Sequence, residues 1–392
     1  MPVEDSSKGR KVLIVAAEAS SCLYAQRLLE HWRDQNLEVE AFGIGNGAMT
    51  ELGFHCLARA EDIAVVGIQE VLSHWGVIKK AFHDVVQAVQ DKRPQVVLLL
   101  DYPGFNLRLA KRLKALDVPV VYYISPQIWA WRQGRVKVIQ KFIHKMLVVF
   151  PFEVDFYRRF GVEVEFVGHP LLDEIERGLR SPAERDAHRA KFGIGPSDLV
   201  LGLMPGSRHS ELDHHLETQL KAAEKLVTED PKLKVMLFVA PNFTVEQLQT
   251  RLSDLKFPLI LIKDEPFRMI ELADVVLCAS GTATLMVGLM GRPMVIMYRM
   301  NPFTAFLAKR FVRHTRFFGL INLVLDQLVA PEVFQEEANP DHLAQLLKPL
   351  LQDQEKREEM RSLLLGAQSK LGTAGATKRV AGVLASYWSG LS

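Results

Sequence analysis

The feature that most constrains the fold is the alternation of short apolar runs with segments of helical period. In the first half of the chain these runs start at Lys11, Gln95, Pro119 and Lys145 and read KVLIVAA, QVVLLLD, PVVYYIS and KMLVVF. A polar or glycine-containing turn and a helix-like stretch follow each run. Continuous apolar strands are typical of parallel sheets that helices cover on both faces. The sequence therefore predicts an α/β protein with Rossmann-like, doubly wound sheets.

The alternation stops once and then restarts, which predicts two domains. At 392 residues the chain exceeds the size at which a single core usually stops growing. A charged stretch punctuated by Pro and Gly follows Gly168, and strands resume with DLVLGLMPGSR. We expect an N-terminal domain over residues 1–168 and a C-terminal domain over 169–375, with residues 376–392 able to pack back onto the first. Ligands of such sheets bind at the carboxyl ends of the strands, so a cleft between the domains is the expected site.

The composition restricts the cellular setting. Cys22, Cys56 and Cys278 lack CxxC spacing, which favours a reducing compartment and argues against a zinc site. The polar N-terminus lacks the apolar stretch of a signal peptide, and no apolar run approaches the ~18 residues of a membrane span. We therefore expect a cytoplasmic protein whose membrane contact is peripheral. We expect no nucleic-acid partner.

Two carboxylates follow strand ends. Asp101 comes directly after the apolar run VVLLL, and Glu18 follows the first strand in AAEASS. A carboxylate at such a position is either a general base whose pKa the site can tune or a cap for the next helix. Both readings stay open for both residues.

Two turns in the second half have the composition of anion-binding sites. Gly206, Ser207 and Arg208 follow one strand, and Ser280, Gly281 and Thr282 follow another. Backbone N–H groups, hydroxyls and a guanidinium near a helix start suit a diphosphate. The alternative is a pair of ordinary helix caps.

Three segments carry patterns of lipid or sugar contact. From Val275 to Leu325 there is no Asp or Glu, and the cations alternate with phenylalanines, as in an interfacial amphipathic segment or a solvated basic face. The cations of this segment that we expect at a membrane are Lys309, Arg310, Arg313 and Arg316. The segment 62–82 has more apolar residues than one buried helix face needs, unless it is simply a core helix. Its candidate contacts are Val66, Ile68, Leu72 and Trp75. In SPQIWAWRQGR, Trp129 and Arg132 could stack on a sugar or bind a phosphate, or belong to the core.

Together these motifs resemble the lipid-A-disaccharide synthase family. DYPGFN, YYISPQIWAWRQGRV, FVGHP, LMPGSR, ASGTATL and MVIMYRMNPFT occur in the order and at nearly the spacing of that family. The resemblance implies a GT-B fold and an inverting transfer of 2,3-diacylglucosamine from its UDP conjugate to the 6-hydroxyl of 2,3-diacylglucosamine 1-phosphate. The products would be the β-1,6-linked disaccharide 1-phosphate and UDP, formed at the inner face of the inner membrane. The resemblance implies no metal and no other cofactor, and it leaves a homodimer open.

The resemblance also assigns residues. It implies Asp101 as the base, Glu18 as an acceptor-side group, and Arg299 as a group facing the phosphates. The UDP site would be lined by Arg208, Ser280, Gly281, Thr282 and Asn322.

The chain departs from the family pattern at several of these motifs. Ser21 and Cys22 replace a glycine and an acid, Met286 replaces a glutamate suited to ribose hydroxyls, and residues 325–328 replace AGRE. Two alternatives follow from these changes. One is a paralogue with another UDP-sugar or lipid acceptor, and the other is a non-catalytic nucleotide- or lipid-binding protein.

Overall fold

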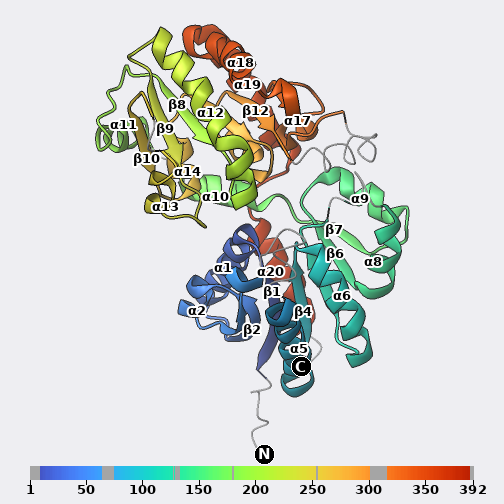
Figure 1. The fold of residues 1–392 in the computed structure, drawn as a ribbon. Helices are drawn as coiled ribbons and strands as arrows, with labels where there is room; N and C mark the ends of the chain where they lie inside the picture. Colours follow the sequence, from blue (N-terminus) through green and yellow to red (C-terminus); the bar gives the residue numbers. More distant parts are fainter. Residues whose placement is uncertain are drawn as a thin grey trace, which may run out of the picture. The chain divides into compact units, whose positions relative to one another are not determined.

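The structure, a computed structural model, describes residues 9–63, 75–126, 128, 133–178, 181–252, 255–300 and 316–388. The chain forms two compact units. Unit 1 comprises Met1–Asp173 and Thr373–Ser392, and unit 2 comprises Glu174–Gly372. Each unit is built around its own parallel sheet (Figure 1). The predicted class, two doubly wound α/β domains, is therefore confirmed.

Sheet A, the seven-stranded sheet of unit 1, has the order β3-β2-β1-β4-β5-β6-β7. Its strands are β1 (Arg10–Ala16), β2 (Val39–Gly45), β3 (His55–Arg59), β4 (Val96–Leu100), β5 (Val120–Tyr123), β6 (Lys145–Val148) and β7 (Val164–Phe166). Neighbouring strands are parallel throughout. All residues of the central strand β4 are buried, as expected for a strand covered on both faces.

Helices cover both faces of sheet A. The helical elements are α1 (Ala19–Asp34), α2 (Gly47–Glu51), α3 (Ala60–Ile63), α5 (Trp75–Lys92), α6 (Pro103–Leu113), η1 (Lys114–Leu116), η2 (Gln133–Arg135), α8 (Val136–Phe142), α9 (Pro151–Arg158) and α20 (Ala376–Ser386). Buried residues of α5, α6 and α8 share one core cluster with Val97 and Leu99 of β4. Side chains alternate across a strand, so Leu98 and Leu100 point to the other face. There they meet α1 and α20.

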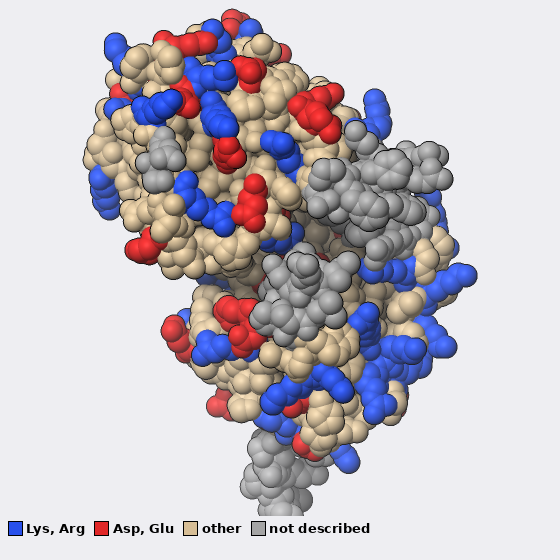
Figure 2. Space-filling view, viewed as in Figure 1, with Lys and Arg blue, Asp and Glu red and all other residues tan. Residues whose placement is uncertain are grey.

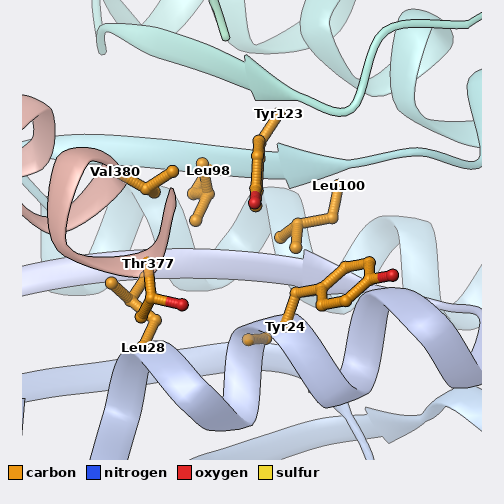
Figure 3. A pocket seen from close by; sticks show the side chains of 8 residues that line it. Tyr24, Leu28, Leu98, Leu100, Tyr123, Thr377 and Val380 are labelled. Carbon is orange, nitrogen blue, oxygen red and sulfur yellow. The ribbon is translucent and has the colours of Figure 1, made fainter. Parts of the chain in front are cut away.

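The C-terminal helix α20 completes that second face. Figure 3 shows Leu28 of α1, Leu98 and Leu100 of β4 and Val380 of α20 around a small, mostly apolar space, with the hydroxyl of Tyr123 pointing into it. Beyond this space, Trp32 of α1 and Trp388 pack edge to face with ring centroids 5.6 Å apart. α20 thus belongs to unit 1, although unit 2 separates it from the rest of that unit in the sequence.

One carboxylate explains where the first unit ends. Asp173 lies in α10 (Pro170–Gly178), and its carboxylate accepts hydrogen bonds from the N–H groups of Gly375 (2.6 Å), Ala376 (3.1 Å) and Thr377 (2.9 Å) at the start of α20. The first turn of α10 is therefore tied to α20. The unit boundaries accordingly lie after Asp173 and Gly372, near the expected positions 168 and 375 but not at them.

Sheet B, the six-stranded sheet of unit 2, has the order β10-β9-β8-β11-β12-β13. Its strands are β8 (Val200–Met204), β9 (Lys234–Phe238), β10 (Leu259–Ile262), β11 (Val275–Ala279), β12 (Met294–Tyr298) and β13 (Glu332–Phe334). The helical elements are α11 (Pro182–Ala190), α12 (His209–Glu229), α13 (Val245–Gln249), α14 (Pro266–Ile270), α15 (Thr282–Leu289), α17 (Leu320–Leu325), η3 (Gln335–Glu337), α18 (Pro340–Gln352) and α19 (Gln354–Lys370). Leucines of α12 and α18 form one core cluster with β8, β9, β11 and β12.

Two further properties concern the helices and polar side chains. None of the helices in the described ranges has the length and hydropathy needed to span a bilayer. Within the same ranges, His, Cys, Asp and Glu side chains form no group of three or more that could hold a metal ion.

Candidate functional site

The two predicted acids lie where the strand order of sheet A reverses. β1 and β4 are neighbours at this switch point, and Ala16 pairs with Leu100 at their carboxyl ends. Glu18 and Asp101 follow these two strand ends and are both partly exposed. Open α/β sheets bind their ligands at such switch points. The carboxyl edge of sheet A is therefore a candidate site that carries two carboxylates.

The backbone at Asp101 is held in an unfavourable conformation. Asp101 and Tyr102 have φ angles of 46° and 44°, in the left-handed region that non-glycine residues rarely adopt. The carbonyl of Asp101 accepts hydrogen bonds from the Tyr122 hydroxyl (2.5 Å) and from Asn106 Nδ2 (2.7 Å). Its N–H donates to the Tyr123 carbonyl at 3.0 Å. Such strain persists only where the surroundings enforce it, and it is frequent at functional sites.

The N-cap of α6 is Tyr102, so Asp101 precedes the cap position. Sequence analysis missed Tyr122 and Asn106, the two side chains that fix the Asp101 carbonyl. Burial, with the charge of Asp101 adding to it, raises the pKa of Tyr122 well above its usual value. Tyr122 therefore remains a neutral donor.

Glu18 is the N-cap residue of α1. Its N–H donates to Ser21 Oγ at 2.9 Å, and Ser21 Oγ donates to the Glu18 carbonyl at 2.8 Å. Burial raises the pKa of Tyr102, and the negative charge of Glu18 raises it further. The Glu18 carboxylate therefore contributes to the electrostatic potential at Tyr102, the residue next to Asp101. Glu18 is thus both a helix cap and part of the electrostatic surroundings of this edge.

The predicted anion-binding turns lie side by side in unit 2. β8 and β11 are neighbours at the switch point of sheet B, where Met204 pairs with Cys278. The residues that follow these strand ends are Gly206, Ser207 and Arg208 after β8, and Ser280, Gly281 and Thr282 after β11. The structure therefore brings these six predicted residues together at one carboxyl edge.

The turn after β8 already holds a carboxylate. Glu211 Oε2 accepts hydrogen bonds from the N–H groups of Ser207 (2.8 Å) and Arg208 (3.3 Å), and Glu211 Oε1 lies 3.4 Å from Arg208 Nη1. Gly206 has a φ of +121°, and a Cβ there would come within 2.4 Å of Glu211 Oε2. A diphosphate at this turn would therefore compete with Glu211 for the same donors. A glutamate three residues after the N-cap is the sequence signal that identifies this arrangement.

The turn after β11 is more open. Gly281 is the N-cap of α15, and no heavy atom lies within 4 Å of the place its Cβ would occupy. Its φ of 161° is ordinary extended backbone, so neither conformation nor packing requires glycine here. Thr282 is exposed, and Ser280 Oγ donates to the Phe318 carbonyl at 3.0 Å. The start of α15 is thus accessible to an anion.

His215, which sequence analysis did not single out, connects two parts of this edge. Its Nδ1 lies 2.8 Å from the Pro205 carbonyl, and its Nε2 lies 3.0 Å from the backbone N of Arg299. Burial lowers the pKa of His215, which favours the neutral ring. A neutral ring that donates through Nδ1 accepts at Nε2, so His215 joins the turn after β8 to the end of β12.

A side-chain hydrogen bond locates the guanidinium of Arg299, the residue expected to face the phosphates. Its Nη1 donates to Thr218 Oγ1 at 2.7 Å, and Thr218 lies in the third turn of α12. The guanidinium therefore lies against the third turn of α12 in this structure, and its contact with the phosphates stays a prediction.

Asn322, which was expected to line the UDP site, makes only internal hydrogen bonds in this structure. Its side chain is 0% exposed. Its Nδ2 donates to the Ala330 carbonyl (2.7 Å) and to Glu332 Oε1 (2.8 Å), and its Oδ1 accepts from the N–H groups of Val329 and Ala330, both at 3.0 Å. These bonds hold the connection between α17 and β13, and a contact of Asn322 with UDP stays a prediction.

Comparison with known proteins identifies the family. A model described as lipid-A-disaccharide synthetase matches residues 12–378. The chain is 41% identical over 377 residues to the lipid-A-disaccharide synthase of Trichlorobacter lovleyi, covering 96% of this chain and 97% of the relative. It is 39% identical over 374 residues to that of Geobacter sulfurreducens, covering 95% and 96%. The chain belongs to the lipid-A-disaccharide synthase family.

Solved structures agree at the level of fold. UDP-GlcNAc 2-epimerase from Neisseria meningitidis, bound to UDP-GlcNAc, aligns with a TM-score of 0.65 at 12% identity, covering 96% of this chain and 100% of its own. MurG from Acinetobacter baumannii aligns with a TM-score of 0.54 at 15% identity, covering 96% and 99%. These neighbours are GT-B enzymes, so the GT-B fold that the resemblance implied is confirmed.

The departures from the lipid-A-disaccharide synthase pattern can now be located. Cys22 is buried, and its Sγ lies 3.3 Å from the Ala16 carbonyl. Burial raises the pKa of its thiol to about 12, so it supplies no charge to the edge of sheet A. Met286 is partly buried in the second turn of α15 and brings no carboxylate there. Asp326 ends α17 in the left-handed conformation, and Leu328 is 59% exposed.

The predicted lipid and sugar contacts are only partly described. Val66, Ile68, Leu72, Trp129, Arg132, Lys309, Arg310 and Arg313 lie outside the described residues. Trp75, the first residue of α5, is 50% exposed, and Val77 is 44% exposed. Arg316 is exposed, and its guanidinium carbon lies 5.7 Å from the Phe317 ring centroid.

Proposed function

We propose that this member of the lipid-A-disaccharide synthase family transfers 2,3-diacylglucosamine from its UDP conjugate to the 6-hydroxyl of 2,3-diacylglucosamine 1-phosphate. The products are the β-1,6-linked disaccharide 1-phosphate and UDP. The observation that carries the proposal is the match to hexosyltransferases of this family over nearly the whole chain. The carboxylate of Asp101 at the switch point of sheet A supports it.

Asp101 is proposed as the general base. The acceptor hydroxyl oxygen forms a bond to the anomeric carbon of the donor, and its proton passes to the Asp101 carboxylate. The bond between that carbon and the diphosphate oxygen breaks, and UDP leaves with the electron pair. Attack on the face opposite the leaving group inverts the configuration and yields the β-linkage. The strained backbone at Asp101, fixed by Tyr122 and Asn106, supports this role because a base must be held in place.

The turns of unit 2 are proposed to hold the donor diphosphate. Arg208 provides a guanidinium whose side chain is 45% exposed, and the start of α15 provides unobstructed backbone N–H groups. Several structural neighbours were solved with UDP or a UDP-sugar, including the HepE protein of Anabaena in complex with UDP and glucose, which supports a UDP-linked donor. In this proposal the diphosphate displaces the Glu211 carboxylate from the turn after β8.

The proposed substrates are acylated lipids, so the proposed reaction occurs at a membrane surface. We propose that the protein works in the cytoplasm, attached peripherally to the inner face of the inner membrane. The exposed side chains of Trp75 and Val77 support contact with lipid at the start of α5.

A direct assay tests the proposed function. The purified protein is incubated with UDP-2,3-diacylglucosamine and 2,3-diacylglucosamine 1-phosphate in detergent micelles, and mass spectrometry follows the products. We expect the disaccharide 1-phosphate and an equal amount of UDP. UDP release only with another sugar acceptor would favour the divergent paralogue, and UDP binding with no release would favour a non-catalytic binding protein.

A further inference from the structure

We infer that unit 1 carries a second membrane-docking surface, a basic face formed by α6, η1, α8 and the end of α9, which binds an anionic phospholipid bilayer. The proposed function explains why the protein would contact a bilayer, and the inference rests on it in that respect alone. The basic face is identified from the charge and exposure of its residues. It involves neither the start of α5 nor the segment around Arg316.

The sequence around this face is almost free of acids. Between Tyr102 and Phe152 it contains nine Lys and Arg residues and a single acidic residue, Asp117. The small net charge of the whole chain, +2, hides this local excess. A surface with one sign of charge produces a field that attracts the opposite sign.

The helices direct these cations outward. Arg108, Lys111 and Arg112 lie at positions i, i+3 and i+4 of α6, so they share one side of the helix, and all three are exposed. Lys137 and Lys141 have the same relation, i and i+4, in α8 and are also exposed. The opposite sides of both helices are packed in the core of unit 1.

Two contacts join these helices into one surface. Lys114 Nζ in η1 donates to the Lys141 carbonyl at the end of α8, at 3.2 Å. On the other side of α8, the amide nitrogen of Gln140 lies 3.6 Å from the place where a Cβ of Gly161 would be. Gly161 follows the exposed residues Arg158 and Arg159 at the end of α9. Figure 2 shows Lys and Arg side chains gathered at the lower right, over the region that holds α6, α8 and α9 in Figure 1.

The cations of the basic face are not neutralised by neighbours. Among the described residues, none of those named above forms an ion pair, whereas Lys145 of the adjacent strand pairs with Glu165 at 2.8 Å. The exposed acids on these elements are Asp117 and Asp155. Because these cations are unpaired, their binding to lipid phosphates breaks no ion pair of the folded protein. Each typically strengthens binding to an anionic bilayer about fivefold.

Aromatic groups favour a bilayer over a soluble polyanion. Phe160, next to Arg159, is 38% exposed, and Phe152 at the start of α9 is 40% exposed. Lys141 Nζ lies 5.6 Å from the ring centroid of the partly exposed Phe142. Phenylalanines beside cations are typical of interfacial surfaces, where the rings enter the headgroup region and the cations bind phosphates.

Vesicle sedimentation tests the basic face with the full-length protein. The vesicles contain either phosphatidylcholine alone or equal parts of phosphatidylcholine and phosphatidylglycerol. The test variant is Lys111→Gln/Arg112→Gln/Lys141→Gln. The control variant, Lys221→Gln/Lys232→Gln/Lys356→Gln, changes the net charge equally with exposed lysines of unit 2. We expect the test variant to bind the anionic vesicles about 100-fold more weakly than the control variant, with the difference shrinking at high salt.

Other outcomes overturn the inference. Equal loss in both variants would mean that net charge alone drives binding, and unchanged binding in the test variant would exclude the face. If the test variant binds a single-stranded oligonucleotide more weakly than the wild type but binds the vesicles equally well, the face binds nucleic acid and not a bilayer. The disaccharide assay in detergent micelles separates this result from the proposed function. In that assay the test variant should retain wild-type turnover. If the wild-type protein is inactive, the proposed function fails, but the vesicle assay still tests the basic face because it measures binding alone.

Discussion

In the proposed function, single residues at the two carboxyl edges carry the chemistry, and the backbone of one of them, Asp101, is held in a strained conformation. Its backbone is in the left-handed region, with neutral donors from Tyr122 and Asn106 fixing its carbonyl. Those bonds involve only main-chain atoms of Asp101. A substitution of the side chain leaves these main-chain bonds in place.

Asp101→Asn should lower turnover about 10²- to 10⁴-fold, the usual contribution of a general base, while the fold stays intact. Asparagine tolerates the left-handed conformation, so the backbone is preserved. The kcat in the micelle assay is the measurement. Asp117→Asn is the matched control, since Asp117 also has a left-handed φ, 51°, but lies at the surface after η1. Near-normal turnover in Asp101→Asn would assign Asp101 a structural role.

Arg208→Ala should weaken UDP binding by about 1.5–3 kcal/mol, the range for a hydrogen bond to a charged group. Isothermal titration calorimetry measures the change. Arg251→Ala is the control, because Arg251 is another exposed arginine of unit 2 paired with an acid, Asp213, at 2.6 Å. If both variants bind UDP like the wild type, the turn after β8 does not bind the diphosphate.

At the scale of elements, the notable feature is the anchoring of α20. The helix is capped by a carboxylate from α10, and its residue Arg379 donates through Nε to the Val167 carbonyl at 2.7 Å. Gly168 next to Val167 has a φ of +79°, and a Cβ there would come within 2.5 Å of Arg379 Nη2. The left-handed φ is what favours glycine in the FVGHP motif, because Arg379 Nη2 is the end of a flexible side chain that can shift.

Asp173→Ala should destabilise unit 1 by about 1–3 kcal/mol, because three N–H groups at the start of α20 lose their acceptor and the helix loses a favourable N-terminal charge. Hydrogen exchange resolved by peptide is the measurement. We expect faster exchange in α20 and unchanged protection in unit 2. Asp341→Ala, in the exposed first turn of α18, is the control. Unchanged exchange in α20 would show that packing alone, including the Trp32 and Trp388 pair, holds the helix.

At the scale of the whole molecule, each unit contains a buried histidine that is neutral near pH 7. Burial lowers the pKa of His169 in unit 1 to about 3 and lowers that of His215 in unit 2. An unfolded histidine takes up a proton near pH 6.5. Below that pH the unfolded chain therefore binds more protons than the folded one, which favours unfolding.

The free energy of unfolding of unit 1 should accordingly fall as the pH drops from about 6.5 towards 3, by up to ~1.4 kcal/mol per pH unit from His169. Urea unfolding followed by hydrogen exchange in each unit measures this dependence. In the wild type, the Leu171 N–H donates to His169 Nδ1 at 3.2 Å. The His169→Asn variant keeps an acceptor for this N–H, but asparagine does not titrate. It should flatten the curve of unit 1 alone, and the exposed His342→Asn should change neither curve. If the free energy of unfolding of unit 1 in His169→Asn falls with decreasing pH as steeply as in the wild type, carboxylates cause the pH dependence.

The sequence alone determined the fold class and the position of the two acids and of the six residues of the unit 2 turns at the carboxyl edges, while their roles stay predictions. Apolar runs that are continuous predict buried parallel strands, and residues directly after such strands must lie at the carboxyl edge. Both inferences depend only on residues that are close together in the sequence.

Only the tertiary structure decided which partners the polar groups of these motifs bind within the protein. Arg299 and Asn322 sit in suitable motifs, but they bond to Thr218 and to the residues around Ala330. Glu211 occupies the donors of its own turn, and Tyr122 fixes Asp101 from the next strand. The physical reason is that a side chain binds whichever partner the packed elements bring within about 3 Å, and most of these partners are distant in the sequence.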